Sequence, residues 1–69
     1  MTQNEAILKY LKNHVGLTQL QALDKLGVMR LPARISELRD MGFDIVTLRK
    51  EVRTRYGKTN VAEYRLIEH

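Results

Sequence analysis

The chain contains no cysteine and no tryptophan, and its 69 residues include a single proline, Pro32. The absence of cysteine excludes disulfide bonds and zinc sites built on thiolates, so packing alone must stabilise the fold. A chain of this length forms one small domain near the lower size limit for a self-supporting hydrophobic core. We therefore expect a single domain over residues 1–69.

Long hydrophobic runs are also missing. Although 43% of the residues are hydrophobic, no apolar run approaches the roughly 18 residues of a membrane-spanning helix. The opening segment MTQNEAILKY contains an acidic residue and a helical period, where a secretory signal needs a basic stretch followed by an unbroken apolar one. We expect a soluble cytoplasmic protein that does not contact a membrane.

The residue types that enzymes use are poorly represented. The sequence has no glycine-rich phosphate loop, and its two histidines are His14 and the terminal His69. Glu37 and Asp40 share a predicted helix face, but the pattern gives them no nucleophile and no metal-ligating neighbour. We predict that the protein is not an enzyme and has no metal site, no cofactor and no small-molecule ligand.

Positive charge is present in excess, and it is concentrated late in the chain. The net charge is +4, which makes this a basic protein. Residues 49–58 contain one acid, Glu51, and five cations: Arg49, Lys50, Arg53, Arg55 and Lys58. A local run of this kind is the electrostatic footprint expected for a polyphosphate partner. The alternative is an ordinary hairpin whose charges serve only its solubility.

Capping patterns predict the first helix. Thr2 and Glu5 have the spacing of a capping box, and Gly16 is well suited to end the helix. We predict a helix over about residues 3–14. Four apolar residues at the helical period should form its buried face: Ile7, Leu8, Leu11 and Val15.

A second capping box, formed by Thr18 and Gln21, predicts a helix over about residues 19–26 that ends at Gly27. Leu17 should pack against Ala22 as a hydrophobic staple. Val28 should fill the corner after the helix. The residues expected on its inward face are Leu20, Leu23 and Leu26.

The third predicted helix covers about residues 31–41. Pro32 suits its first turn, and Gly42 suits its end. Its inward stripe should consist of Leu31, Ile35 and Leu38. The polar residues fall on the other side, with Arg34 at the edge: Arg30, Ala33, Ser36, Glu37 and Asp40.

A short helix with a polar outer face, joined to a preceding helix by a glycine turn, fits the major groove of B-form DNA. Arginine can pair with guanine or grip phosphate, small residues allow close approach, and glutamate can accept a hydrogen bond from cytosine. The candidate DNA contacts are Arg30, Ala33, Arg34, Ser36 and Glu37. The alternative is a solvated face on which charges three and four residues apart pair with each other.

After Gly42 the period changes to that of β-strands. We predict strands over about residues 44–53 and 61–67, joined in an antiparallel hairpin, with Tyr64 and Leu66 in the core. The buried face of the first strand is left open between two sets: Ile45 and Thr47, or Val46, Leu48 and Val52. The turn-rich tip over residues 54–60 should lie along the phosphate backbone or enter a minor groove. The candidate contacts on the hairpin are Arg53, Arg55, Tyr56, Lys58 and Asn60.

Three segments, LTQLQALDKLGV, RLPARISELRDMGFDIVT and AEYRL, resemble the small winged helix-turn-helix domains of phages and prophages. The resemblance covers about residues 4–67. It implies an α+β fold, with a three-helix core followed by a two-stranded antiparallel β-hairpin wing. It also implies sequence-specific binding of double-stranded DNA in transcriptional control, excision or replication initiation. Arg34 and the outer face of the third helix would contact DNA, and the hairpin from Arg53 to Asn60 would be the wing.

A different partner remains an alternative, because a fold does not fix a function. The domain could be a protein-interaction module or inhibitor that docks on a host or phage protein complex. Glu37 and Asp40 favour this alternative, since carboxylates repel phosphate. If DNA is the partner, one module of this size covers few base pairs, so a homodimer or a second DNA-bound protein is expected to add specificity.

Overall fold

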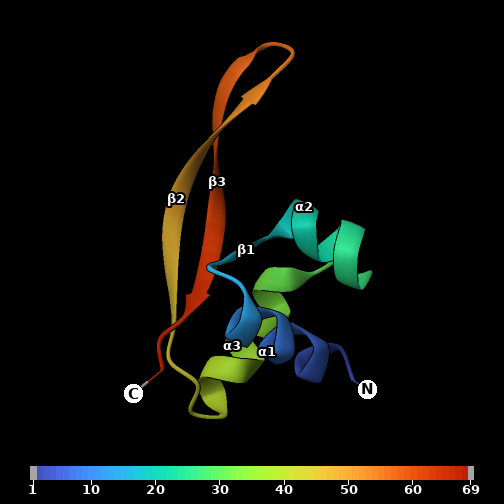
Figure 1. Ribbon diagram of the computed structural model, residues 1–69, viewed down its shortest axis with the longest axis vertical. Coiled ribbons are helices and arrows are strands. Elements are labelled where there is room, and N and C mark those ends of the chain that lie inside the picture. Colours follow the sequence, from blue (N-terminus) through green and yellow to red (C-terminus); the bar gives the residue numbers. More distant parts are fainter. Residues whose placement is uncertain (1, 69) are drawn as a thin grey trace.

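The computed structural model describes residues 2–68 and contains helices, a π-helical turn (η1) and a three-stranded sheet (Figure 1). The elements in chain order are α1 (Gln3–Asn13), β1 (Leu17–Thr18), α2 (Gln19–Gln21), η1 (Ala22–Leu26), α3 (Leu31–Asp40), β2 (Ile45–Thr54) and β3 (Gly57–Leu66). Within residues 2–68, no helix is long and apolar enough to cross a membrane.

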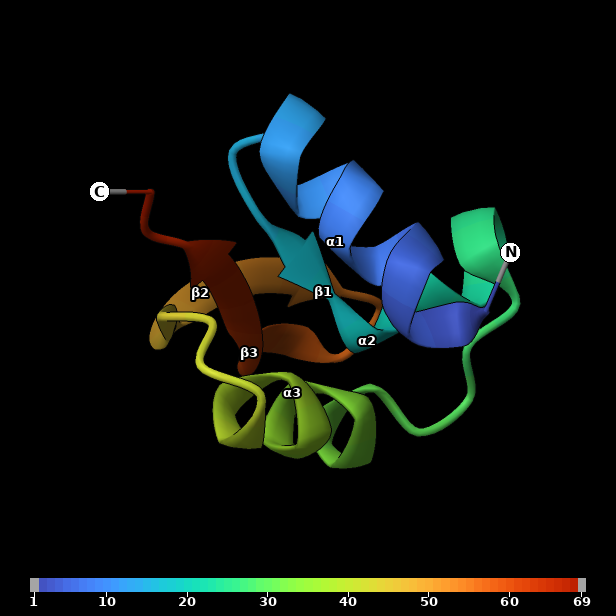
Figure 2. The ribbon, with the colours of Figure 1, turned by 90° about the horizontal axis from the view of Figure 1, so that it is seen from below.

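The helices and the base of the sheet surround one core, and the rest of the hairpin projects beyond them (Figures 1 and 2). The molecule measures 38 × 24 × 20 Å along its principal axes. The largest fully buried side chains form its centre: Ile7, Leu17, Val28, Leu31, Ile35 and Leu38. The predicted inward stripe of α3 and the predicted place of Val28 are therefore confirmed.

Part of the predicted apolar face of the first two helices is wrong. Val15 is 77% exposed because α1 ends at Asn13 and the chain continues in an extended conformation. Leu20 and Leu23 are 75% and 47% exposed, whereas Ala22 is fully buried. The reason is that α2 ends after three residues and continues as the π-helical η1, whose wider turn changes which side chains face the core.

Side-chain hydrogen bonds cap the start of α2 and bridge the connection that follows η1. The Thr18 hydroxyl accepts from the Gln21 amide at 3.2 Å, and the Gln21 side chain accepts from the Thr18 amide at 3.0 Å, which confirms the capping box. Gln19 bridges the next connection. Its Nε2 donates to the Val28 carbonyl at 2.9 Å, and its Oε1 accepts from the Leu31 amide at 2.7 Å. This side chain therefore ties the start of α2 to the start of α3.

The end of α3 follows the prediction for Gly42. The Gly42 amide donates to the Arg39 carbonyl at 3.0 Å, and the Phe43 amide donates to the Leu38 carbonyl at 3.1 Å. This is the Schellman pattern, which satisfies carbonyls that the helix leaves unpaired. The chain then turns directly into β2.

The sheet contains one strand that the sequence did not predict. Its order is β1-β3-β2, all antiparallel, and Leu17 of β1 lies opposite Tyr64 of β3. The predicted bounds of the second hairpin strand are wrong, because β3 begins at Gly57 and not near residue 61. Only Arg55 and Tyr56 separate the paired residues Thr54 and Gly57, so most of the expected loop is strand.

The tight turn depends on Thr54 and Gly57. The Thr54 hydroxyl donates to the Gly57 carbonyl at 3.1 Å and accepts from the Tyr56 amide at 3.2 Å. Gly57 has a φ of 124°, which side chains rarely permit. The ladder therefore continues to the tip of the hairpin. At its base, Ile45 is buried, which settles which face of β2 meets the core.

Glu63 of β3 is a charged residue that the fold buries. It is 7% exposed, because the backbone of Gly16 lies against it on the way from α1 to β1. A Cβ at Gly16 would lie 2.7 Å from Cγ and Cδ of Glu63. The carboxylate accepts from Arg65 at 2.8 Å and pairs with Nζ of Lys50 at 3.5 Å. Two cations thus compensate the buried charge.

Gln19→Ala should lower the free energy of unfolding by about 1–3 kcal/mol, because it leaves the Leu31 amide and the Val28 carbonyl without their partner. Urea unfolding monitored by circular dichroism measures this loss. The matched control is Gln3→Ala at an exposed position of α1, which should change stability by less than about 0.5 kcal/mol. Equal stability of the two variants would contradict the bridging role of Gln19.

Candidate nucleic-acid interface

The outer face of α3 carries the residues that the sequence singled out. Arg30, Ser36 and Glu37 are exposed, and Ala33 and Arg34 are half-buried. Arg30 is the N-cap of α3, and its own side chain forms no capping hydrogen bond. These five residues thus lie on one element, as predicted, but they differ in how freely they could meet a ligand.

Arg34 and Glu37 are tied to each other and to α1. Nη2 of Arg34 lies 3.2 Å from Oε2 of Glu37, and Oε1 of Glu37 accepts from Nδ2 of Asn4 at 3.3 Å. Nε of Arg34 is buried without a hydrogen-bond partner within residues 2–68. The charge of Arg34 is therefore already compensated, and its side chain lies on the flank of α3 nearest the start of α1.

The opposite flank of α3 faces β2 through Arg39. Nε of Arg39 donates to the Ile45 carbonyl at 2.8 Å, and Nη2 donates to the Thr47 hydroxyl at 2.8 Å. These two bonds fix the angle between α3 and the base of the hairpin. Neither Arg39 nor Thr47 was among the predicted site residues.

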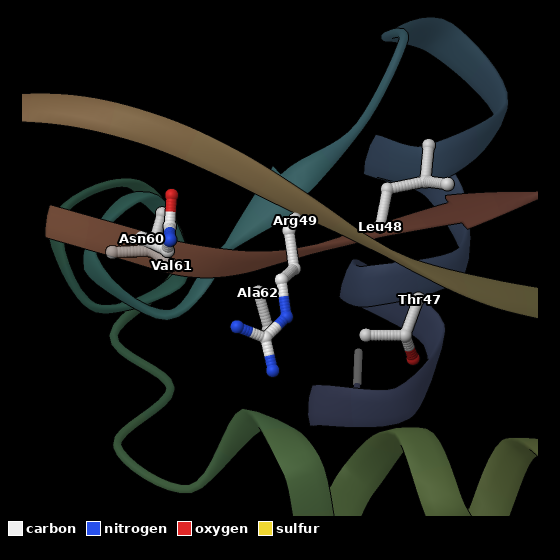
Figure 3. A pocket seen from close by; sticks show the side chains of 6 residues that line it. All are labelled: Thr47, Leu48, Arg49, Asn60, Val61 and Ala62. Atoms are coloured by element: carbon white, nitrogen blue, oxygen red, sulfur yellow. The ribbon is translucent and has the colours of Figure 1, made fainter.

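Arg49 extends the same surface along the hairpin. Figure 3 shows its side chain pointing from β2 toward α3, as does that of Thr47, whereas Leu48 points to the other side. Arg49 and Thr47 line a hollow of about 420 Å³ together with residues of β3. Among the described residues, the Arg49 guanidinium has no ion-pair partner, so its charge is available to an anion.

Strand register places Arg53 on the same face as Arg49. Thr47 lies opposite Tyr64, Arg49 opposite Ala62 and Arg53 opposite Lys58. Residues two apart on a strand share a face. Arg39, Arg49 and Arg53 are here called the arginine row, which runs from the α3 flank toward the tip of the hairpin. Glu51 shares this face, but it pairs with Lys58 at 3.4 Å.

The tip of the hairpin carries the other predicted residues. Arg55 and Tyr56 form the turn, and Tyr56 is 96% exposed. Lys58 and Asn60 are exposed on β3, although Glu51 compensates the charge of Lys58. Arg53 and Arg55 have no ion-pair partner in the part of the chain that the structure describes. The tip therefore presents two uncompensated cations beside an exposed aromatic ring.

The sequence contained a signal for Arg49 that the prediction did not use. Arg49, Glu51 and Arg53 alternate along one strand, so settling the buried face of β2 at Ile45 would have placed Arg49 beside α3. Arg39 gave no such signal, because its role depends on a hairpin that folds back along α3. The described residues hold no cluster of His, Cys, Asp or Glu that could bind a metal ion.

A family model described as a winged helix-turn-helix domain matches residues 2–69. The chain belongs to this family. No curated protein and no solved structure shows a significant match. The β2–β3 hairpin is the wing, and α3 occupies the position of the recognition helix. Winged helix-turn-helix domains are typically DNA-binding modules without catalytic activity, so membership suggests DNA as a partner of this chain.

Arg39→Ala should lower the free energy of unfolding by about 1–2 kcal/mol, because two charge-assisted hydrogen bonds between α3 and β2 are lost. Amide hydrogen exchange should also become faster at the base of the wing, around Thr47. Arg30→Ala is the control, since it removes an equal charge from the start of α3 without a side-chain hydrogen bond at the cap. If both variants unfold at the same urea concentration, Arg39 does not hold the wing.

Proposed function

We propose that this winged helix-turn-helix protein is a sequence-specific double-stranded DNA-binding regulator, with α3 in the major groove and the wing along the backbone. The observation that carries the proposal is the arginine row. Its three guanidiniums extend from the α3 flank along the hairpin face that points toward α3. Their charge matches the phosphates that flank a groove occupied by a helix.

Of the two acids of α3, Glu37 and Asp40, the position of Glu37 supports this placement of DNA. Glu37 is paired with Arg34 on the flank toward α1, away from the flank on which Arg39 meets β2. The only acid on the wing face of the arginine row, among the described residues of β2 and β3, is Glu51, which Lys58 compensates. On the hairpin face of the arginine row, the cations therefore outnumber the acids among the described residues, and the acid of α3 that has no ion pair there is the exposed Asp40 at the end of the helix.

Within this proposal the parts of the surface have different tasks. Arg30, Ala33 and Ser36 would meet base edges or nearby phosphates, and the wing residues would neutralise phosphate. Arg34 would contribute through its pair with Glu37, which holds its guanidinium in one place. If about four cations displace counterions, log affinity should fall against log salt with a slope of roughly −3 to −4.

The biological role that we propose is transcriptional control, excision or replication initiation in a phage or prophage. Its support is the resemblance of the sequence to such domains. A single domain of this size contacts few base pairs, so a homodimer or a second DNA-bound protein would supply the remaining specificity.

The wing face beside α3 can be tested against the flank of α3 toward α1. Arg49→Ala should weaken binding to all duplexes alike and make the salt slope shallower by about 1, because an uncompensated cation is lost. Arg34→Ala should change the slope less, because Glu37 already compensates Arg34. Fluorescence anisotropy across a salt series, with random and genomic-upstream duplexes, measures both. A larger slope change for Arg34→Ala than for Arg49→Ala would contradict this proposal, because it would place DNA on the flank of α3 toward α1.

The wing can be tested with a double variant. Arg53→Ala combined with Arg55→Ala should weaken binding to every sequence and make the salt slope shallower by about 2. The control is Lys9→Ala combined with Lys12→Ala, which removes the same net charge from exposed positions of α1. The slope should be unchanged in the control. No binding by the unaltered protein at low salt would contradict the DNA proposal as a whole.

A further inference from the structure

A groove on the side of α2 is left unexplained by DNA binding. It has a volume of about 410 Å³ and lies between the start of α2, Pro32 at the start of α3, and the wing. Figure 1 shows the upper part of the wing bending over α2. The apolar side chains in its lining include Leu20, Val52 and Val61. Leu20 is strongly exposed, although it is a large apolar residue on a two-turn helical segment that could have buried it.

An unpaired strand edge opens into this groove. β1 pairs only with Tyr64 and Glu63 of β3, and the chain then leaves the sheet to form α2. Residues 57–62 of β3 are therefore paired with β2 on one side and with no described strand on the other. Val61 and Ala62 belong to this stretch and also line the groove. An extended chain placed there could continue the line of β1 and hydrogen-bond to β3.

The charges that line the groove indicate the chemistry of a partner that would fit it. Lys50 and Arg53 line it, and no acid is among the lining residues that the structure describes. Lys50 reaches Glu63 at 3.5 Å, but its side chain is still 47% exposed. An occupant should thus combine apolar side chains, which cover Leu20 and Val61, with carboxylates on its other face for Arg53.

We infer that the groove binds an extended acidic segment of another protein, added as a strand beside β3. Its backbone would pair with the free edge of β3. Strand register places Val52 and Val61 on one face of the hairpin and Arg53 on the other, so in an alternating segment the apolar side chains would lie on Leu20, Val52 and Val61 and the carboxylates would meet Arg53. A second copy of this chain fits poorly, because its own outer strand β2 is cationic and the net charge is +4. DNA also fits poorly, because its phosphates could use only the cations of this lining, and the apolar side chains would stay uncovered.

The probe is a synthetic capped peptide in which Glu alternates with Val, added to the ¹⁵N- and methyl-labelled full chain. Saturable NMR shifts are expected at Leu20, Val52 and Val61. Leu20→Ser should weaken binding about tenfold, because one apolar contact is lost at an exposed position that the fold does not need. Arg53→Gln should weaken it as well. Met29→Ser is the matched control, since Met29 is equally exposed but does not line the groove.

Two altered peptides separate the parts of the inference. A peptide with Lys in place of Glu should not bind, and N-methylation of alternate residues should remove binding, because it blocks strand pairing. The inference is overturned if the Glu peptide causes no shifts, if the Lys peptide binds equally well, or if Met29→Ser weakens binding as much as Leu20→Ser. It is also overturned if a DNA duplex changes the NMR shifts of the Leu20, Val52 and Val61 methyl groups and the peptide does not. The same holds if self-association of the chain, without peptide, causes the shift changes.

Discussion

The position of the recognition helix depends on one side-chain amide, that of Gln19. As donor and acceptor at once, it bonds to Val28 and Leu31 on both sides of the non-helical connection. The start of α3 is thereby fixed against α2, and the stripe headed by Leu31 enters the core. The far end of α3 then presents Arg39 to β2, whose hydrogen bonds set the base of the wing. The two parts of the proposed DNA surface are thus linked through side chains on α2 and α3.

Local chemistry explains which parts of the fold could be predicted from the sequence. The caps at Thr18 and Gly42 and the stripe of α3 depend on neighbours within a few residues, so their patterns are visible in the chain. Leu20 and Leu23 were misplaced, because a π-helical turn breaks the period on which the prediction relied. β1 was missed because two residues carry no period, and their pairing with β3 is purely tertiary.

The candidate site also combines features that local sequence sets with features that only tertiary contacts set. Residues of α3 and of the wing tip could be named from charge and helix phase, but their ion pairs could not. Arg34 and Lys58 each have a nearby carboxylate, whereas Arg49 and Arg53 have none among the described residues. These pairings compensate Arg34 on the flank toward α1 and Lys58 near the tip of the wing, and they leave the guanidiniums of the arginine row without a carboxylate. The electrostatic pattern therefore depends on where the acids fold to, and not on the number of cations in the run.

The wing lacks the packing that stabilises the rest of the molecule. Its buried residues lie at its base, where Ile45 and Tyr64 enter the core, and from Leu48 to Asn60 it is exposed apart from the half-buried Val52. A two-stranded ribbon without a covered face is at best marginally stable in water. Phosphates on the arginine row or a third strand beside β3 would each supply contacts that the chain itself does not make there. Such contacts would stabilise the wing, and partners that meet it on either side would act on the same local opening equilibrium.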